Sequence, residues 1–363
     1  MTSAPVLDLD RDVVSLTADL VDIPSESRSE GPLADAVEAA LRRIPHLRVD
    51  RDGDTVVART SLSRPSRVLI GGHLDTVPSA GNLPHTITDG AIHGLGSCDM
   101  KGGVAVGLRL AAMVDRPVHD VTYVFYECEE IDARFNGLAR LAETHPDWLA
   151  ADFAILMEPS RAGIEAGCQG TVRAQVRTTG VRAHSARSWL GRNAIHEAGQ
   201  ILHRLEEYEP RRVSVDGLEY REGLNAVGIE GGIAGNVIPD ACVVTVNYRF
   251  APTRTVEEAE RHVRDVFEGF DVEIVDRAAG ALPGLDRPAA AEFIASVGAE
   301  PRPKFGWTDV ARFSALGVPA VNYGPGDPSL AHAVDERVPI ADLVACERVL
   351  SGWLSGRSTG VTP

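Results

Sequence analysis

Four short runs of apolar and β-branched residues constrain the fold of this 363-residue chain more than any other feature. The runs are residues 67–70 (RVLI), 121–126 (VTYVFY), 153–157 (FAILM) and 320–323 (AVNY). Helical patterns separate them, which is typical of the strands of an α/β sheet. In such sheets ligands bind at the carboxyl ends of the strands. The side chains that follow the four runs are therefore expected to meet at one edge of the sheet.

Each run leads into a residue type that binds metal ions. His73 follows the first run, Glu129 and Glu130 follow the second, Glu158 follows the third, and His332 follows the fourth. Histidine nitrogen and carboxylate oxygen are the donors that zinc uses in hydrolases. We therefore predict two Zn²⁺ ions per chain, with Co²⁺ as the alternative metal.

Asp99 is the predicted bridge between the two ions. Ions about 3.5–4 Å apart are held as a pair in many hydrolases, and a bridging carboxylate suits that spacing. Asp99 lies in the small-residue segment GLGSCDMKGG, where glycines let the backbone approach closely. The predicted ligands are His73, Glu158 and Asp99 for one ion, and Glu130, His332 and Asp99 for the other.

Two further carboxylates have predicted catalytic roles. Glu129 is left over beside the ligand Glu130, and an uncoordinated carboxylate next to a metal-activated water can accept the proton of that water. Neighbouring residues on an extended segment point in different directions, which lets one bind metal while the other acts as a base. Asp75 lies two residues after His73 and is expected to accept the proton on the other ring nitrogen of that histidine.

The predicted pattern of secondary structure changes near residue 171. From there to residue 279 the pattern indicates strand, helix, two strands, helix and strand, the order of a ferredoxin-like unit. Thr255 and Glu258 fit a capping box at the start of the second helix. None of the four metal-bearing runs lies in this stretch. We therefore predict a catalytic domain from residues 1–170 and 280–363, with an inserted domain at residues 171–279.

Composition excludes several classes of function. The formal net charge of −16 disfavours nucleic-acid binding, which requires basic patches. No apolar run approaches the roughly 20 residues that span a membrane. The five cysteines are odd in number and widely spread, which fits a reducing compartment such as the cytoplasm. An anionic small substrate stays compatible, because a few arginines can reverse the potential inside a cleft.

The motifs together resemble one family, the zinc-dependent aminoacylases, deacylases and exopeptidases. The matching stretches are GGHLDTVP, GLGSCDMKGG, CEEID, MEPS, RAHSA and AHAVDE, in the order of the family along the whole chain. The resemblance implies a zinc-exopeptidase-like α/β domain with a mostly parallel central sheet, and an inserted α+β lid and dimerisation domain. It also implies a homodimer in which His184 reaches the active site of the other subunit as an oxyanion donor.

Two stretches, HSARSWLGRNAIH and KFGWTDVARF, resemble the desuccinylases of actinobacteria. The resemblance implies hydrolysis of an anionic N-acyl amino acid, N-succinyl-LL-2,6-diaminopimelate, with substrate contacts at Arg249, Asn236 and Gly324. Cys168 departs from the pattern, since some desuccinylases have an arginine in this region. Two alternatives stay open: a related deacylase or dipeptidase with another acyl pocket, and, from another class, a non-catalytic metal-binding scaffold.

Overall fold

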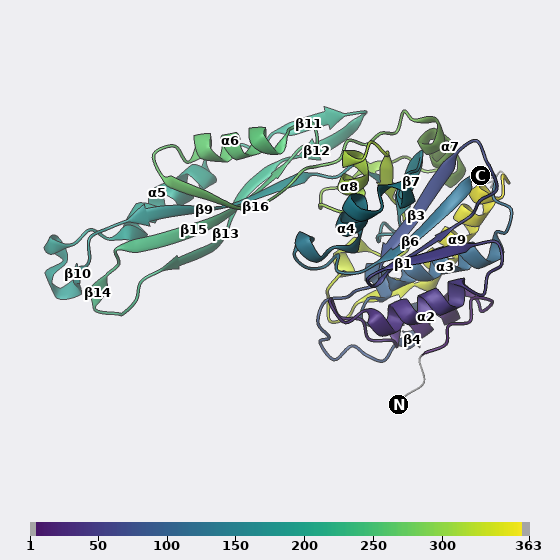
Figure 1. Cartoon of the computed structure of the whole chain (residues 1–363). Helices are drawn as coiled ribbons and strands as arrows, with labels where there is room; N and C mark the ends of the chain where they lie inside the picture. Colours follow the sequence, from purple (N-terminus) through teal and green to yellow (C-terminus); the bar gives the residue numbers. More distant parts are fainter. Residues whose placement is uncertain (1–4, 358–363) are drawn as a thin grey trace. The chain divides into compact units, whose positions relative to one another are not determined.

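The computed structural model describes residues 5–357, which form two compact units (Figure 1). Unit 1 comprises Met1–Ala166, Pro283–Arg302 and Arg312–Pro363, and unit 2 comprises Gly167–Leu282 and Pro303–Ala311. The boundaries predicted from the sequence place the segment Pro303–Ala311 in the catalytic domain, whereas the structure assigns it to unit 2. It lies after the predicted return to the catalytic domain, but it packs with unit 2.

Unit 1 is built on an eight-stranded sheet with the order β1-β2-β6-β3-β7-β18-β8-β17. The strands are β1 (Arg48–Asp52), β2 (Thr55–Arg59), β3 (Arg67–His73), β6 (Asp120–Tyr126), β7 (Phe153–Leu156), β8 (Glu165–Ala166), β17 (Arg302–Pro303) and β18 (Ala320–Asn322). The four runs identified in the sequence form β3, β6, β7 and β18. They are neighbours in the sheet and pair in parallel. The prediction of a mostly parallel central sheet is confirmed.

Helices cover this sheet. They are α1 (Val13–Val21), α2 (Gly31–Leu41), α3 (Gly102–Met113), α4 (Gly137–Thr144), α7 (Pro288–Val297) and α9 (Ile340–Leu354). Helix α8 (Val310–Ala315) begins in the segment assigned to unit 2 and ends in unit 1. Nearly every residue of α3 is buried, because this helix packs on β3 and β6 and also contacts α1, α2 and α9. Gly107 permits the contact, since a Cβ there would lie 3.2 Å from the ring of Phe125. A separate small sheet joins β4 (Thr86–Thr88), β5 (Ala91–His93) and β19 (Arg337–Pro339).

Unit 2 has the predicted ferredoxin-like order of elements. Its sheet has the order β13-β15-β9-β16, and its elements are β9 (Gly170–Thr179), α5 (Ala194–Glu206), β13 (Gly223–Gly231), β15 (Ala241–Phe250), α6 (Val256–Val266) and β16 (Asp271–Ala278). The alternating strands bury one face against the two helices. The capping box of Thr255 and Glu258 at the start of α6 is present, which confirms that prediction.

Two short strand pairs in unit 2 were not predicted from the sequence. Strands β11 (Arg212–Val215) and β12 (Leu218–Arg221) are joined by Asp216 and Gly217, both with positive φ, as a tight hairpin turn requires. Strands β10 (Ala183–His184) and β14 (Val237–Ile238) form the second pair. Within residues 5–357 no helix is both long enough and apolar enough to cross a membrane.

Candidate metal centre and active site

The structure brings the four predicted metal ligands that follow strands, and the predicted base Glu129, to one edge of the unit 1 sheet beside Asp99. His73 is the last residue of β3, the two glutamates lie three and four residues after β6, and Glu158 lies two residues after β7. His332 follows β18 at the end of a loop. Parallel neighbours have their carboxyl ends at the same edge, so residues up to 259 positions apart in sequence become neighbours.

Three groups of these side chains have ligand atoms within 4.8 Å of one another. The groups are His73, Asp99 and Glu158; Asp99, Glu130 and His332; and His73, Glu129 and Glu130. The first two are the two ligand sets that the sequence predicts, and Asp99 belongs to both. The donor set of imidazole nitrogen and carboxylate oxygen therefore fits a pair of zinc-like ions.

The two carboxylate oxygens of Asp99 face different histidines. Its Oδ1 lies 3.1 Å from Nε2 of His73, and its Oδ2 lies 3.5 Å from Nε2 of His332. His332 also lies 2.8 Å from Oε1 of Glu130. Hydrogen bonds with Asp99 and then Glu130 raise the pKa of His332 to about 10. Burial would raise the pKa of Asp99, but the hydrogen bonds of the two histidines lower it far below its ordinary value.

Asp75 joins His73 to the loop that carries the two glutamates. Its carboxylate accepts hydrogen bonds from the backbone N–H of Glu129 at 3.0 Å and of Glu130 at 3.1 Å, and from the hydroxyl of Ser27 at 2.8 Å. For Nδ1 of His73, the backbone carbonyl of Asp75 at 3.0 Å is a closer partner than its carboxylate at 3.5 Å. Asp75 therefore fixes the position of both strand ends, a larger part than the sequence suggested.

The expectation of an extended segment at Glu129 and Glu130 is wrong. Strand β6 ends at Tyr126, Cys128 has a left-handed φ of 59°, and the two glutamates lie in a bend. The two side chains still differ in their surroundings, because Glu130 belongs to two of the three ligand groups and Glu129 to one. The bend, and not strand alternation, therefore places both carboxylates near His73 and Glu130 also near Asp99 and His332.

Two glycines place Glu158. A Cβ on Gly103, at the start of α3, would lie 2.2 Å from the carbonyl oxygen of Met157, and a Cβ on Gly324 would lie 2.1 Å from the same atom. Both segments therefore pack directly on the backbone that carries Glu158. The backbone N–H of Gly324 donates to Oγ of Ser160 at 3.0 Å, and its carbonyl accepts from Ser160 and from the N–H of Ala162. The backbone groups of Gly324, a predicted substrate contact, thus already have partners within the chain.

Two buried charged residues beside Asp99 received no structural role from the sequence. Glu336 is 2% exposed and accepts hydrogen bonds from the backbone of the Asp99 segment. Lys101 is 1% exposed, and its Nζ donates to the carbonyl of Ile23 at 2.7 Å. Burial raises the pKa of Glu336 to about 7 and lowers the pKa of Lys101 to about 7. The partners of both residues lie far away in sequence, so no local sequence pattern could predict the roles of Glu336 and Lys101.

The remaining predicted residues lie in unit 2. His184 is exposed at the end of β10, and its Nδ1 accepts the N–H of Ala186 at 3.0 Å. Asn236 lies beside it, because its carbonyl accepts the N–H of Ser185 at 2.9 Å. Arg249 is half-buried near the end of β15 and is the register partner of Thr171. His184 and Asn236 therefore share one end of unit 2, and Arg249 lies at the other end of its sheet.

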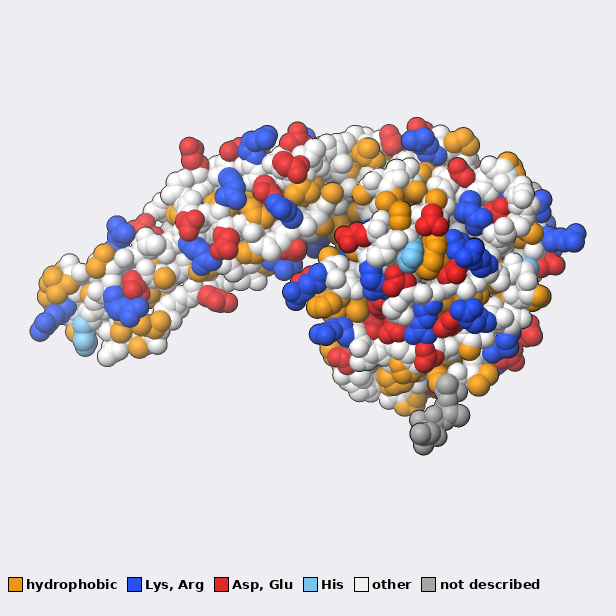
Figure 2. All heavy atoms as spheres, viewed as in Figure 1, with side chains coloured by type: hydrophobic (Ala, Val, Ile, Leu, Met, Phe, Trp, Pro, Cys, Tyr) orange, Lys and Arg blue, Asp and Glu red, His pale blue; other side chains and the backbone are white. Residues whose placement is uncertain are grey.

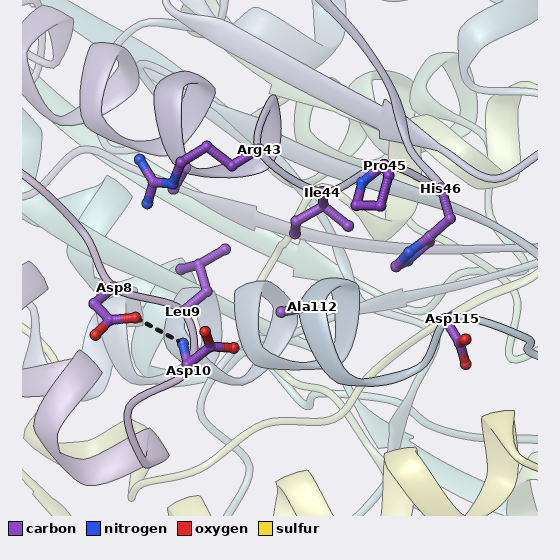
Figure 3. Close-up of a pocket in the computed structure, with 10 residues that line it drawn as sticks. Asp8, Leu9, Asp10, Arg43, Ile44, Pro45, His46, Ala112 and Asp115 are labelled. Atoms are coloured by element: carbon purple, nitrogen blue, oxygen red, sulfur yellow. Dashed lines mark hydrogen bonds between the residues drawn. The ribbon is translucent and has the colours of Figure 1, made fainter.

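A pocket in unit 1 lies apart from these residues. It has a volume of about 270 Å³ and lies between the N-terminal segment, the end of α2 and the end of α3 (Figure 3). Asp8 and Asp10 lie at one end of it, and His46 and Asp115 lie at the other, so its polar side chains do not converge (Figure 3). No predicted site residue lines this pocket. The candidate site is therefore the edge of the unit 1 sheet where the three ligand groups lie. We call it the metal edge; its residues are His73, Asp99, Glu129, Glu130, Glu158 and His332.

This chain belongs to the peptidase family M20/M25/M40, whose model matches residues 69–355. It is accordingly a metal-dependent amidohydrolase.

Individual relatives are similar over almost the whole chain. A protein of Mycobacterium tuberculosis with a provisional assignment as a succinyl-diaminopimelate desuccinylase is 58% identical over 354 residues, which cover 97% of this chain and 100% of the relative. The succinyl-diaminopimelate desuccinylase of Corynebacterium glutamicum is 48% identical over 362 residues, covering 97% and 98%. Among solved structures, the dinuclear metal-binding peptidase YXEP of Bacillus subtilis shares the fold with a TM-score of 0.71 at 17% identity, covering 94% and 96%.

Proposed function

We propose that the chain hydrolyses N-succinyl-LL-2,6-diaminopimelate to succinate and LL-diaminopimelate in lysine and diaminopimelate biosynthesis. The identity of 58% and 48% to two relatives of this assignment, over nearly their full lengths, supports the substrate. The observation that carries the chemistry is the pair of ligand groups that share Asp99. We also propose a cytoplasmic location, in agreement with five cysteines that are all buried and free of disulfides.

We propose two Zn²⁺ ions per chain, with Co²⁺ as the alternative, held by the two ligand groups defined above. When bound, such ions polarise the amide carbonyl and lower the pKa of the attacking water. Glu129 accepts the proton of that water and delivers it to the leaving amine nitrogen. Asp75 keeps Glu129 in place through its backbone N–H. Zinc-loaded protein should contain two ions per chain, and His332→Ala, which removes a ligand of one group only, should retain mainly one.

A homodimer is part of the proposal, with His184 of the partner subunit as oxyanion donor. The geometry within unit 2 supports this arrangement. Arg249 pairs with Thr171 and the other end of β9 is Thr179, so eight residues of strand, about 26 Å at roughly 3.3 Å per residue, separate the two ends. His184 lies beyond Thr179. One small substrate cannot contact Arg249 and His184 of the same chain, so joint action requires two chains.

Exposed apolar side chains provide a surface for the second subunit. In Figure 2, apolar side chains gather at the end of unit 2 that carries β10 and β14. Those exposed most strongly in this part of the chain are Trp189 (77%), Ile233 (66%) and Leu190 (62%). Strand β13 also lies at the edge of its sheet and is exposed from Asn225 to Gly231. Unpaired edges and large apolar patches are typical of association surfaces.

A second candidate function is that of a related deacylase or dipeptidase with another acyl pocket. One observation favours it: Cys168, in the region where some desuccinylases have an arginine, is fully buried, and its Sγ faces the carbonyl of Thr308 at 3.8 Å. A buried thiol cannot supply the positive charge that a succinyl carboxylate attracts.

An assay of the zinc-loaded enzyme separates the two functions. N-succinyl-LL-diaminopimelate, N-acetylornithine and a set of dipeptides are compared at equal concentration, with Glu129→Gln as the blank. The proposal predicts that kcat/KM for the succinyl substrate exceeds the others by at least about 10²-fold, since a charged partner missing from a built site costs several kcal/mol. An N-acetyl substrate or a dipeptide at the top of the ranking assigns the second function.

A further inference from the structure

We propose that Glu336 is a positioning residue that holds Asp99 in its bridging geometry and thereby sets the affinity of both metal sites. The inference rests on the two-metal function proposed above. Glu336 lies four residues after His332, at the end of the same loop, and its side chain is 2% exposed. Its side chain hydrogen-bonds to the backbone N–H groups of Gly96, Cys98 and Asp99. Its effect on the metal centre therefore passes through the backbone of the Asp99 loop, defined here as residues 96–99.

The carboxylate of Glu336 binds three backbone N–H groups of this loop. Its Oε1 accepts from Cys98 at 2.9 Å and from Asp99 at 2.9 Å, and its Oε2 accepts from Gly96 at 2.9 Å. The backbone of Glu336 adds a fourth contact, since its carbonyl accepts the N–H of Gly94 at 3.1 Å. An ionised acceptor forms stronger hydrogen bonds than a neutral one, and three of them on one short loop fix its backbone.

The loop has little other regular structure to hold it. Asp99 has φ of −120° and ψ of 95°, outside helical values, and the N–H of Ser97 donates to the carbonyl of Gly94 at 3.1 Å. The N–H groups of Gly96, Cys98 and Asp99 lack the partners that a regular helix gives, and Glu336 supplies them. Packing restricts the loop from the other side. A Cβ on Gly96 would lie 2.6 Å from the side chain of Thr76, and a Cβ on Gly326 would lie 2.7 Å from Sγ of Cys98. Glu336 therefore completes the set of contacts that fix the backbone position of Asp99, which we call the seat of Asp99.

Both ions depend on this seat. Asp99 is the residue shared by the two ligand groups that match the predicted sites, and its two oxygens face His73 and His332 separately. A shift of the Asp99 backbone moves both oxygens together. Loss of Glu336 is therefore expected to weaken both metal sites, whereas loss of His332 removes a ligand from one of them. Joint weakening is the signature of the positioning role.

The test compares Glu336→Gln with Asp335→Asn. Asp335 is the adjacent acid; its side chain is 73% exposed and pairs with Arg337, so the control removes the same charge one residue away from the contact. In Glu336→Gln an amide N–H must face at least one N–H of the loop. Metal-free protein is titrated with zinc against a chelator at pH 8. We expect both zinc affinities to fall about 10–100-fold in Glu336→Gln, the usual effect of losing an outer-shell partner. Asp335→Asn should match the wild type.

Two further readouts separate positioning from loss of stability. At saturating zinc, Glu336→Gln should have a reduced kcat and an unchanged KM, because Glu336 is buried and touches no substrate. The visible absorption of the Co²⁺-loaded variant should also differ from that of the wild type, since these bands report the ligand geometry. A variant that is only less stable would show the wild-type spectrum once loaded.

The outcomes distinguish this inference from the proposed function. A wild type that binds fewer than two ions overturns the two-metal proposal itself. A wild type with two ions, together with Glu336→Gln affinities within twofold of Asp335→Asn or weakened at one site only, overturns the role of Glu336. If Glu336→Gln does not fold, Glu336→Asp keeps the charge but withdraws it by one methylene. The same joint loss is then expected, and unchanged affinities at both sites overturn the inference.

Discussion

The metal edge of unit 1 and the exposed end of unit 2 both contribute residues to the proposed chemistry, but they differ in how deeply those residues are buried and in what holds them in place. At the metal edge, His73 and Glu158 are 1% and 6% exposed, and carboxylates of the same unit fix the loops around them. At the end of unit 2, His184 and Asn236 are exposed, and the contacts that hold them are local backbone contacts.

This difference shows which part of the active site is complete within one chain. Catalytic groups act best when the fold positions them before the substrate arrives. The metal edge meets that condition by itself. His184 does not, because its surroundings are solvent and a patch of exposed apolar side chains. In the proposed homodimer, a second chain would bury that patch and bring His184 to a metal edge.

The largest expected effect comes from a change at the metal edge. Glu129→Gln should lower kcat by roughly 10²–10⁴-fold, the usual contribution of a general base, while both ions stay bound. Activity assays and metal analysis of the same preparation measure this. A variant that loses one ion, or that keeps wild-type turnover, would show that the roles of Glu129 and Glu130 are exchanged.

The next prediction tests whether the end of unit 2 acts on another chain. His184→Ala should lower kcat about 10²–10³-fold, the effect of removing one oxyanion donor. Mixing it with Glu129→Gln under subunit exchange should restore activity, because each mixed dimer has one site with an intact base and an intact donor. About half of the dimers are mixed and half of their sites are intact, so recovery should approach about one quarter of wild-type sites. Confirmed exchange without recovery would place His184 in its own chain or outside the reaction.

The sequence was sufficient to predict that the candidate ligands meet, because the strands have a local signal. Apolar β-branched runs indicate strands, parallel strands align their carboxyl ends, and the following histidines and glutamates then have to meet. The ferredoxin-like order of unit 2 was visible for the same reason. The bend after Tyr126 had no such signal, because a left-handed residue at Cys128 is not a local preference of cysteine.

The parts that sequence reasoning missed depend on contacts between distant residues. Glu336 binds the N–H of Gly96 across 240 positions, and Gly324 packs on Met157 across more than 160. The segment Pro303–Ala311 likewise joins unit 2 by packing that no periodicity encodes. Strand patterns thus predict where the ligands meet. The residues that hold the ligands in place follow from tertiary packing alone.

Paired glycine substitutions sharpen the comparison of the two regions. Gly324→Ala forces a methyl group against the carbonyl of Met157 and should destabilise the protein by about 1–3 kcal/mol, the usual cost of overpacking a core. It should also weaken the metal site that contains Glu158. Gly235→Ala in unit 2 is the control, since a Cβ there has no atom within 4 Å. Urea unfolding and zinc titration measure both effects. Equal stability of the two variants would contradict the close packing at Gly324.

The smallest expected effect is a difference of one in the number of protons that zinc binding releases. In the metal-free protein Asp99 and Glu130 raise the pKa of His332 to about 10, so this histidine is protonated at pH 7.5. A histidine that binds zinc must be neutral, and binding therefore releases that proton. Since the raised pKa favours the protonated form at every pH below about 10, zinc affinity should rise with pH through this range instead of levelling off near 6.5.

Calorimetry in two buffers of different ionisation enthalpy counts the protons that zinc binding releases. His332→Ala should release about one proton fewer per chain than the wild type. The same proton count in both proteins would mean that His332 is neutral before zinc binds, and that its contacts with Asp99 and Glu130 do not hold a charge.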